Sequence, residues 1–401
     1  MKTELKSICV IGLGYIGLPT ASLLGTKGYI VTGVDVSSDV VETINQGHIH
    51  IIEPDLDLLV KSAVNAGNLK ASLEPCKADI FIIAVPTPFK DEYVPDLTYV
   101  RQATKTIAPL IEKGNLVILE STSPVGTTNM VADILEEHGH NTVDDVFVAH
   151  CPERVLPGRI LIELVQNDRI VGGINKASTA VAADFYKEFV SGEVLETSAK
   201  TAELSKLTEN SFRDVNIAFA NELSLICDKE HIDVWELISL ANRHPRVDIL
   251  NPGPGVGGHC IAVDPWFIIH RNPEHSKLIR SAREVNDAKP EWVINKVKEK
   301  AERFKLPVIA CLGIAFKADV DDLRESPAVA ITKKLIKENV GKIIVCEPNI
   351  KKHKDFDLCS FDEAIDKADI ILVLVDHQPF KSLSATKLSE KIVIDTRGII
   401  K

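Results

Sequence analysis

Hydrophobic residues in the first part of the chain form short continuous runs, separated by longer segments with helical spacing. The runs predict strands at residues 7–11, 30–34, 79–85, 115–119 and 146–149. A helix is expected between the first two runs, at residues 18–27. Continuous apolar strands that alternate with helices are typical of a parallel sheet covered on both faces. The pattern therefore predicts an α/β, doubly wound domain.

The middle of the chain has a different pattern. Residues 201–231 contain no Gly or Pro, and apolar residues recur in them at helical spacing. These apolar residues are Leu204, Leu207, Phe212, Val215, Phe219, Leu223 and Ile226. A helix this long has to bury surface on several sides, so we expect it to be the spine of a domain and a contact between subunits.

The C-terminal part repeats the α/β pattern. Helices are expected at residues 290–305 and 327–338, and strands at 306–314, 342–346, 369–375 and 391–395. No GxGxxG motif follows the first of these strands, so a second dinucleotide is not expected. The predicted fold class is α/β, with two Rossmann-like doubly wound regions joined by a long central helix.

Composition and charge exclude several classes of protein. With 401 residues, the chain is long enough for two or three domains. The net charge of −11 argues against general binding to nucleic acid or to acidic membranes, and no apolar run approaches the ~20 residues of a membrane span. No signal peptide is expected at the N-terminus. The eight cysteines are scattered without a CxxC pair, which predicts reduced thiols in the cytoplasm and no metal site.

A glycine motif follows the first strand directly. Gly12, Gly14 and Gly17 form GxGxxG, and Asp35 follows the second strand. In dinucleotide-binding folds such glycines admit the pyrophosphate to the start of a helix, and an acid about 20 residues further on accepts hydrogen bonds from the ribose. No Arg or Lys lies close after Asp35, which favours NAD over NADP. The alternative is a tight strand-to-helix turn that binds no ligand.

Three later strands of the first part end in polar and turn residues. Thr87, Thr122 and Glu153 lie just beyond the third, fourth and fifth predicted strands. Ligands of parallel sheets bind at the carboxyl ends of the strands, so these side chains are expected near the nicotinamide half of the cofactor. Each one alone is more often a helix cap or a turn residue than a ligand.

Basic side chains in two segments are candidates for catalysis or for phosphate binding. Lys206 and Asn210 are four residues apart in the predicted long helix and share a face. Lys206 is either a solvated charge or a catalytic ammonium. Lys317 and Arg324 follow the first strand of the C-terminal part, where a cation can meet a phosphate. The alternative for both is an ordinary surface charge.

The segment at residues 251–265, NPGPGVGGHCIAVDP, is interpreted as a stiff loop that presents Cys260. Asp264 lies four residues beyond this cysteine. One alternative is a small buried hydrophobe, the commonest fate of a free cysteine. Another is a metal site with His259, but adjacent residues seldom point the same way and no second pair has metal-ligand spacing. We therefore favour a nucleophile.

Several long motifs occur in one order: VIGLGYIGLP, ESTSPVGTT, CPERVLPGR, AELSKLTENSFRDVNIAFANELS, NPGPGVGGHCIAVDPWFI and GIAFKADVDDLRESPA. With them the chain resembles the UDP-glucose/GDP-mannose dehydrogenase family over essentially its whole length. The cysteine loop and NRHPRV resemble the mannosaminuronate branch; the UDP-glucose branch tends to have Lys where this chain has Val263. The resemblance implies an NAD domain at residues 1–196, a central helical dimerisation domain at 197–300 and a UDP-sugar domain at 301–401.

The resemblance also implies an activity: a four-electron oxidation of the C6 alcohol of a UDP-sugar by NAD, in a cytoplasmic homodimer or higher homo-oligomer. Cys260 would capture the C6 aldehyde as a thiohemiacetal. Lys206 and Asn210 would stabilise the substrate oxygen, and Asp264 would orient water. Glu153 and Thr122 are further candidates for the base-and-water network.

Binding residues follow from the same resemblance. Cofactor contacts are expected at Gly12, Gly14, Tyr15, Ile16, Gly17, Asp35, Thr87, Thr122 and Arg324. Substrate contacts are expected at Glu153, Arg154, Val155, Lys206, Asn210, Arg246, Gly257 and Lys317. Either Arg243 or Arg246 would reach the substrate from a partner subunit.

Other activities are compatible with parts of the sequence. Within the family, UDP-N-acetylglucosamine and UDP-glucose are alternative substrates. The two-electron β-hydroxyacid dehydrogenases also pair a Rossmann domain with a Lys-xxx-Asn helix, but they need neither Cys260 nor a second α/β region. A short-chain epimerase would require Tyr-xxx-Lys, which does not occur. A non-catalytic sensor of NAD or UDP-sugar would have no use for a reactive cysteine.

Overall fold

The computed structural model describes residues 6–90, 93–156, 158–258, 260–383 and 388–400. The described residues form two compact units, and each is described by itself. One unit is made from Met1–Thr208 and Trp266–Arg271, and the other from Glu209–Pro265 and Asn272–Lys401. His259, named above as a possible metal ligand, lies outside the described residues.

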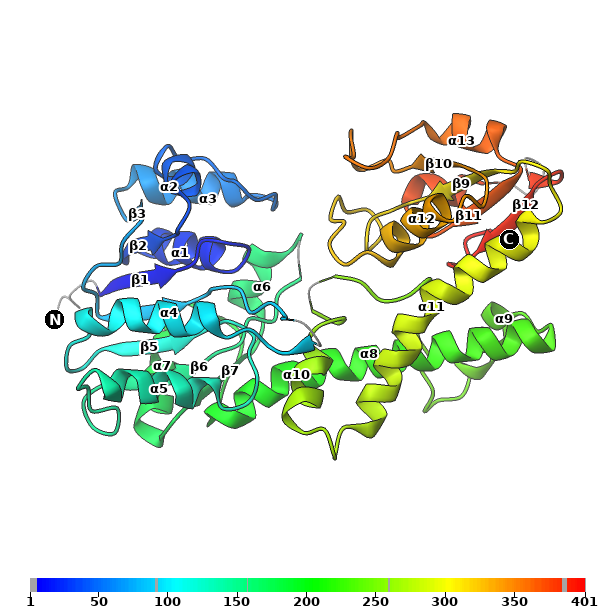
Figure 1. Cartoon of the computed structure of the whole chain (residues 1–401). Coiled ribbons are helices and arrows are strands. Elements are labelled where there is room, and N and C mark those ends of the chain that lie inside the picture. Colours follow the sequence, from blue (N-terminus) through cyan, green and yellow to red (C-terminus); the bar gives the residue numbers. More distant parts are fainter. Residues whose placement is uncertain (1–5, 91–92, 157, 259, 384–387, 401) are drawn as a thin grey trace. The chain divides into compact units, whose positions relative to one another are not determined.

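The first unit is built on an eight-stranded sheet with the order β3-β2-β1-β4-β5-β6-β7-β8 (Figure 1). All neighbouring strands are parallel except β6 and β7. The first six strands have the order 3-2-1-4-5-6 of dinucleotide-binding sheets. The strands are β1 Ser7–Ile11, β2 Ile30–Val34, β3 Leu69–Ser72, β4 Ile80–Ile83, β5 Leu116–Leu119, β6 Phe147–His150, β7 Arg169–Gly173 and β8 Val194–Ser198.

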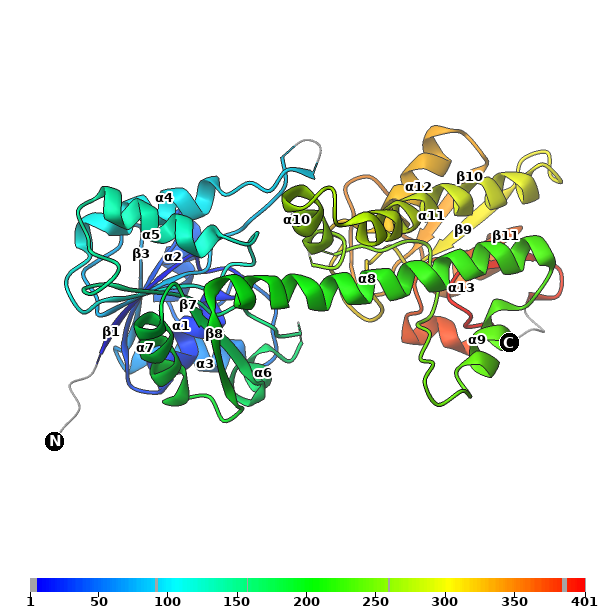
Figure 2. The same ribbon diagram turned by 90° about the horizontal axis from the view of Figure 1, so that it is seen from below.

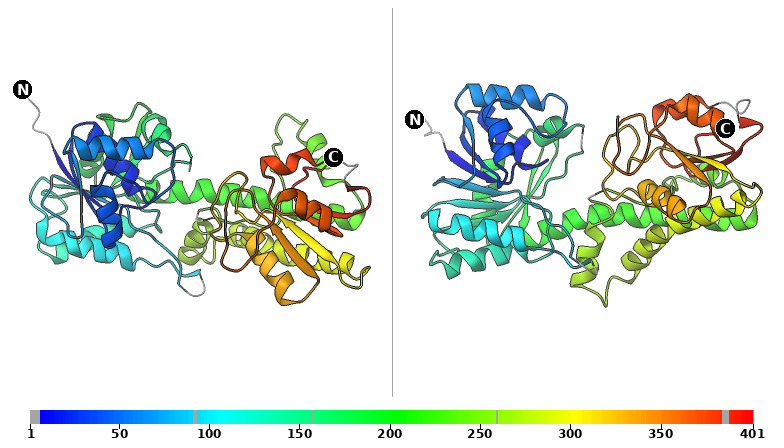
Figure 3. Two further views of the ribbon diagram at one scale, coloured as in Figure 1. Left: turned by 90° about the horizontal axis from the view of Figure 1, so that it is seen from above. Right: turned by 45° about the horizontal axis from the view of Figure 1, so that its top comes forward.

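Helices cover both faces of this sheet. Two apolar clusters lie on opposite faces because successive strand residues point to opposite sides; Ile8 belongs to one cluster and Cys9 to the other. Helices α1, α2, α3, α6 and α7 pack on the face of Ile8, and α4 and α5 on the face of Cys9 (Figures 1 and 3). Their bounds are α1 Gly17–Thr26, α2 Ser38–Asn45, α3 Leu56–Asn65, α4 Thr98–Ile107, α5 Thr127–Glu137, α6 Ile160–Gln166 and α7 Lys176–Lys187.

Helix α8, Ala199–Glu230, is the long helix expected from the sequence (Figure 2). It has 32 residues, and its residues up to Thr208 belong to the first unit. Its buried residues include polar ones such as Glu203, Asn210 and Asp214. Buried polar side chains need hydrogen-bond partners, and Glu203 finds them in the first unit while Asn210 and Asp214 find them in the second.

The second unit contains a four-stranded, fully parallel sheet of order β10-β9-β11-β12 (Figure 1). Helices α11 and α12 pack on one face of this sheet, and α13 packs on the other. The strands are β9 Val308–Leu312, β10 Lys342–Cys346, β11 Ile370–Val373 and β12 Ile392–Asp395. The helices are α9 Val234–Ala241, α11 Lys277–Ala301, α12 Pro327–Lys337 and α13 Phe361–Lys367; α10, Asp264–Arg271, passes from this unit into the first. Both sheets confirm the predicted α/β class.

One predicted boundary is wrong. The helix expected at residues 290–305 is α11, which begins at Lys277 and includes Pro290 in its interior. A proline removes one helical hydrogen bond, but buried residues on both sides of it, among them Asn286 and Val293, hold the helix together. The ring of Pro290 lies against Gly255, where an added Cβ would be 3.1 Å from the proline Cγ. Within the described parts of the chain, no helix is both long enough and apolar enough to cross a bilayer.

Candidate active site

The turn between β1 and α1 has room for a ligand on one side only. The φ of Gly12 is +93°, and its N–H donates to Val34 O at 2.8 Å. A Cβ on Gly17 would lie 1.8 Å from Gly12 O, so a side chain cannot fit there. At Gly14 nothing lies within 4 Å of an added Cβ. The first and third glycines therefore close the turn, and the second leaves the side where a pyrophosphate would approach.

The surroundings of this turn fit NAD. Helix α1 begins after Ile16 without any side-chain cap, so its N-terminal dipole is available to an anion. The Asp35 carboxylate accepts from Leu13 N at 3.1 Å and from Ser37 N at 3.0 Å, which fixes it between the glycine turn and β2. The half-buried Asp35 is placed to accept ribose hydroxyls, and the half-exposed Tyr15 borders the same turn.

The loops that follow β4 and β5 are joined by hydrogen bonds. The Thr87 hydroxyl donates to Thr122 O at 2.6 Å, and the Ser121 hydroxyl donates to Val85 O at 2.7 Å. Both threonine side chains are half-buried. The bond fixes the two loops at the carboxyl edge of the sheet, where the reacting part of a dinucleotide binds.

Glu153 is buried after the end of β6. Its Oε2 accepts from Arg169 Nη1 at 2.7 Å, and its Oε1 accepts from Arg154 N at 2.7 Å. Arg154 Nη1 donates to Asp168 O at 3.1 Å, and Val155 packs on the apolar cluster of that sheet face. The structure thus shows Glu153 as part of a buried ion pair; its predicted role with substrate stays a prediction.

A second carboxyl, missed in the sequence, lies beside this pair. Glu120 follows β5 directly, is 2% exposed, and accepts from the Tyr186 hydroxyl at 2.7 Å. Burial, and then the charge of Glu153, raise the pKa of Glu120 to about 7. Its position two residues before Thr122, at the carboxyl end of an apolar strand, is the sequence signal that could have identified it.

Glu203 is a second functional candidate that sequence reasoning missed. It lies on α8 and is buried against the start of α5. Its carboxylate accepts from Gly126 N at 2.6 Å and from both the N–H and the hydroxyl of Thr128 at 2.7 Å. Lys206 is three residues further along the same face of α8. Glu203 therefore fixes the part of α8 that bears Lys206 against the first unit.

In the second unit, glycines let the cysteine loop lie directly on the segment after β9. An added Cβ at Gly257 would be 2.4 Å from Glu325 O, and one at Gly258 would be 2.9 Å from the Phe316 ring. Gly258 N also donates to Arg324 O at 3.3 Å. This close packing requires glycine at both positions. It brings the loop of Cys260 next to the segment that contains the predicted cations.

Cys260 itself is exposed, which excludes the buried-hydrophobe alternative. The backbone turns tightly after it, because Asp264 N donates to Cys260 O at 2.8 Å. Asp264 begins α10 and is buried, and its Oδ2 accepts from Asn210 Nδ2 at 2.5 Å. The structure therefore brings Asn210 and Asp264 together beside the cysteine turn; Thr122, Glu153 and Lys206 belong to the first unit.

The remaining predicted cations have individual environments. Lys317 is exposed in the segment after β9, and Arg324 pairs with Asp322 at 2.6 Å. Arg243 and Arg246 follow α9, and both are exposed. Either is thereby accessible at the surface, and the predicted reach to a partner subunit stays a prediction.

Arg397, at the carboxyl edge of the second sheet, was not predicted as a site residue. It follows β12, and its Nε donates to Asp376 at 2.8 Å. Its Nη1 would lie 2.6 Å from a Cβ on Gly253, so the guanidinium lies against the cysteine loop. The carboxyl ends of parallel strands are where ligands bind, which makes Arg397 a further candidate for a phosphate contact.

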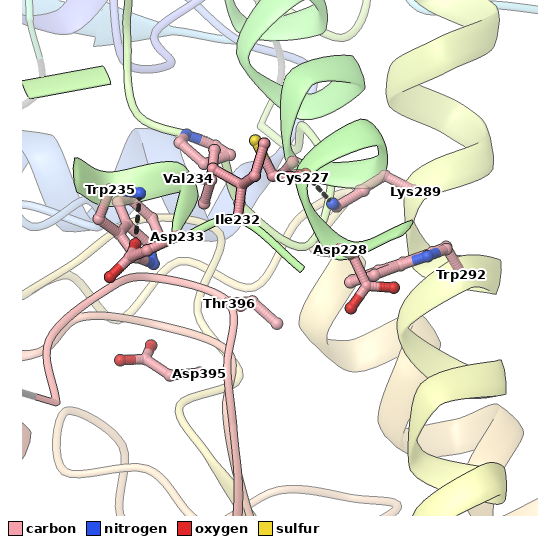
Figure 4. A pocket seen from close by; sticks show the side chains of 13 residues that line it. Cys227, Asp228, Ile232, Asp233, Val234, Trp235, Lys289, Trp292, Asp395 and Thr396 are labelled. Carbon is pink, nitrogen blue, oxygen red and sulfur yellow. Dashed lines mark hydrogen bonds between the residues drawn. The ribbon is translucent and has the colours of Figure 1, made fainter. Parts of the chain in front are cut away.

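A separate cavity of about 290 Å³ lies among α8, α9, α11 and the end of β12 (Figure 4). The buried Lys289 donates to the Ser224 hydroxyl there and lies 4.1 Å from the Trp292 ring centroid. Burial lowers the pKa of Lys289 to about 8. None of the predicted site residues lines this cavity.

The sheet order and the glycine turn of the first unit are those of a dinucleotide-binding domain. Models of the UDP-glucose/GDP-mannose dehydrogenase family match the chain in three parts. The NAD-binding domain matches residues 6–190, the central domain 200–288 and the UDP-binding domain 310–401. The chain belongs to this family and is an NAD-dependent nucleotide-sugar dehydrogenase.

Similar proteins cover almost the whole chain. An NDP-N-acetyl-D-galactosaminuronic acid dehydrogenase of Ralstonia nicotianae is 55% identical over 99% of this chain and 96% of its own length. A UDP-N-acetyl-D-mannosamine dehydrogenase of Campylobacter jejuni is also 55% identical, over 96% of this chain and 98% of its own. The solved structure of a UDP-N-acetyl-mannosamine dehydrogenase of S. aureus is 42% identical with a TM-score of 0.91, and covers 98% of this chain and 96% of its own.

Proposed function

We propose that this protein oxidises C6 of UDP-N-acetyl-D-mannosamine to a carboxylate with two NAD⁺, giving UDP-N-acetyl-D-mannosaminuronate. The observation that supports this most is the exposed Cys260 in a glycine loop packed on the segment after β9, within a chain that matches a UDP-binding domain. The functional domains are then residues 1–196 for NAD, 197–300 for dimerisation and 301–401 for the UDP-sugar. The scattered cysteines support a cytoplasmic location.

Cys260 acts between the two oxidations. NAD⁺, when bound, accepts one hydride from C6 in each of two oxidations. After the alcohol has become an aldehyde, the Cys260 thiolate adds to C6 and the carbonyl oxygen gains a proton, which forms a thiohemiacetal with a C–H at C6. Loss of the second hydride and of the hydroxyl proton gives a thioester. Water then attacks C6, the carboxylate forms, and the Cys260 sulfur leaves.

The other residues assist these steps. Asn210, held by Asp264, donates an amide hydrogen to the substrate oxygen, and Lys206 stabilises the same oxygen as negative charge develops. Asp264 accepts a proton from the attacking water. Thr122 and Glu153 support the water network from the NAD domain, and Arg154, Val155, Arg246, Gly257 and Lys317 bind the UDP-sugar. Arg324 contacts the cofactor.

The substrate is tested by the yield of NADH from a panel of UDP-sugars at limiting concentration. We expect two NADH per UDP-N-acetyl-D-mannosamine and a much lower kcat/KM with UDP-N-acetylglucosamine, UDP-N-acetylgalactosamine and UDP-glucose. The panel is needed because relatives of equal identity, 55%, have different sugars in their names. Preference for another sugar would change the assigned substrate, and one NADH per sugar would contradict the four-electron mechanism.

We further propose that the protein is a homodimer formed through α8. Three exposed apolar residues, Phe212, Phe219 and Ile226, are 68%, 51% and 51% exposed, and they are seven residues apart. Residues at this spacing lie on one stripe of a helix. A second copy of the chain fits the stripe, because two identical α8 helices can each bury the other's aromatic side chains about a two-fold axis.

Phe219→Glu is expected to convert the dimer to a monomer, because it places a charge at the centre of the buried stripe. The measurement is the molar mass by light scattering coupled to size-exclusion chromatography. Leu58→Glu is the matched control: Leu58, on α3 of the first unit, is 65% exposed and should leave the mass unchanged. A wild-type monomer, or a Phe219→Glu dimer as tight as the wild type, would exclude this interface.

A further inference from the structure

Two buried residues after β10 and β11 hold the segment that follows β9. Glu347 comes directly after β10, and His377 lies four residues beyond the end of β11; both side chains are fully buried. They contact the chain at residues 313–319, the segment that contains Phe316 and Lys317. Buried polar side chains of this kind are kept because they satisfy one another and the backbone around them.

Glu347 binds the first half of the segment. Its Oε2 accepts from Ile314 N at 2.8 Å and from Ala315 N at 3.0 Å, and its Oε1 accepts from Asn349 N at 3.0 Å. Burial favours the neutral acid, but the hydrogen bonds from His377 and from these N–H groups lower the pKa of Glu347 below its ordinary value. The carboxyl is therefore an ionised acceptor.

His377 binds the second half. Its Nδ1 lies 2.9 Å from Asp319 N, and its Nε2 lies 3.0 Å from Glu347 Oε2. A backbone N–H can only donate, so Nδ1 is the acceptor and the ring proton is on Nε2, which donates to Glu347. Asn349 Nδ2 also lies 2.9 Å from Nδ1. Gln378 N in turn donates to Asp319 Oδ1 at 2.9 Å.

The segment needs this support. Asp319 has a φ of +59°, in the left-handed region that residues other than glycine rarely adopt. The backbone between its two held ends presents Lys317 to solvent and places the Phe316 ring against Gly258, two residues before Cys260. A shift of the segment would move both the exposed cation and the support of the cysteine loop.

We infer that His377 and Glu347 are positioning residues for the UDP-sugar: they fix the segment at residues 313–319 so that Lys317 can bind the nucleotide phosphates. The inference rests on the proposed function only in that the ligand is a UDP-sugar. Neither residue touches the reacting atoms. Their effect should therefore fall on UDP and UDP-sugar binding and leave NAD⁺ binding unchanged.

The test compares three substitutions of His377 in the full chain. His377→Leu loses the hydrogen bonds with Asp319 N and Glu347 and the contact with Asn349 Nδ2. His377→Asn keeps an acceptor at the place of Nδ1, so it retains the bond from Asp319 N. His377→Gln keeps a donor for Glu347 and loses the acceptor for Asp319.

His353→Asn is the matched control, because His353 Nδ1 also accepts a backbone N–H, from Asp355 at 3.0 Å, in a loop without Lys317.

The measurement is the Kd for UDP and for NAD⁺ by calorimetry. His377→Leu is expected to raise the Kd for UDP about ten-fold, with His377→Asn closer to the wild type than His377→Gln and with the Kd for NAD⁺ unchanged. Equal UDP affinity in all folded variants would overturn the inference, as would a parallel loss of NAD⁺ affinity. UDP binding needs no turnover, so a shifted Kd for UDP supports this inference even if no sugar of the panel is oxidised.

Discussion

Cys260→Ser is expected to abolish formation of the sugar acid, with a fall in the rate of acid production of about 10³-fold or more. A serine hydroxyl is a much weaker nucleophile than a thiolate, so the C6 aldehyde would not be held for a second oxidation. The first oxidation needs no covalent bond to the protein. The measurement is a single-turnover reaction with excess enzyme, in which NADH and acid are quantified together.

Two features of the structure make this experiment clear to interpret. Cys260 is exposed in a loop, so a serine there leaves no cavity and no buried polar group. Cys76 is also exposed, and Cys76→Ser therefore serves as the matched control, with acid formation expected at the wild-type rate. Acid formation that is unchanged in Cys260→Ser would show that Cys260 is not the nucleophile and that the acid arises by another route.

The local patterns of the chain predicted its local structures well. The GxGxxG turn with Asp35, five strands of the first sheet, the four strands of the second and the long helix α8 follow from periodicity and glycine placement within a few residues. Strands β3, β7 and β8 of the first sheet were not predicted. These features depend on neighbours in the sequence, so the sequence contains the information that forms them. The start of α11 was missed because Pro290 usually marks a helix boundary, and only the packing around it shows why the helix continues.

Contacts between distant residues were not predictable in the same way. Asn210 and Asp264 were each identified as candidates, but their hydrogen bond joins positions 54 residues apart and depends on how α8 and α10 pack. Glu120, Glu203 and His377 resembled ordinary polar residues in the sequence. Each of them can be recognised as a candidate only in the folded structure, where it is buried and has defined hydrogen-bond partners.

Helix α8 provides a buried polar residue to each unit. In the first, Glu203 of α8 ties the start of α5, and in the second Asn210 of the same helix binds Asp264 beside Cys260. One helix therefore presents polar side chains to both units. The stretch from Glu203 to Asn210 contains no Gly or Pro, which favours a continuous helix there.

Arg169→Met is expected to destabilise the first unit by about 3–5 kcal/mol. Arg169 and Glu153 form a buried pair with 3% and 5% of their side chains exposed. Removing the guanidinium leaves the Glu153 charge buried without a counter-ion, next to Glu120. The measurement is the free energy of unfolding in urea, followed by circular dichroism at several pH values.

The loss should grow with pH. Glu120 has its pKa raised to about 7 from an ordinary 4.5, mainly by burial, so the contribution of Glu120 to wild-type stability decreases as the pH rises from 4.5 through 7. The Arg169 charge counteracts this rise in the pKa of Glu120. In Arg169→Met the pKa of Glu120 would be raised further, and stability would continue to fall above pH 7.

A surface pair gives the control for this experiment. Arg159, the N-cap of α6, has its Nε 3.5 Å from Glu163 Oε1, and its side chain is 62% exposed. Arg159→Met should therefore lower the free energy of unfolding by no more than about 1 kcal/mol at any pH. The double variant Arg169→Met with Glu153→Gln should recover much of the lost stability, because no unpaired charge is left buried. Equal losses in Arg169→Met and Arg159→Met would mean that the buried pair contributes no more to stability than an exposed one.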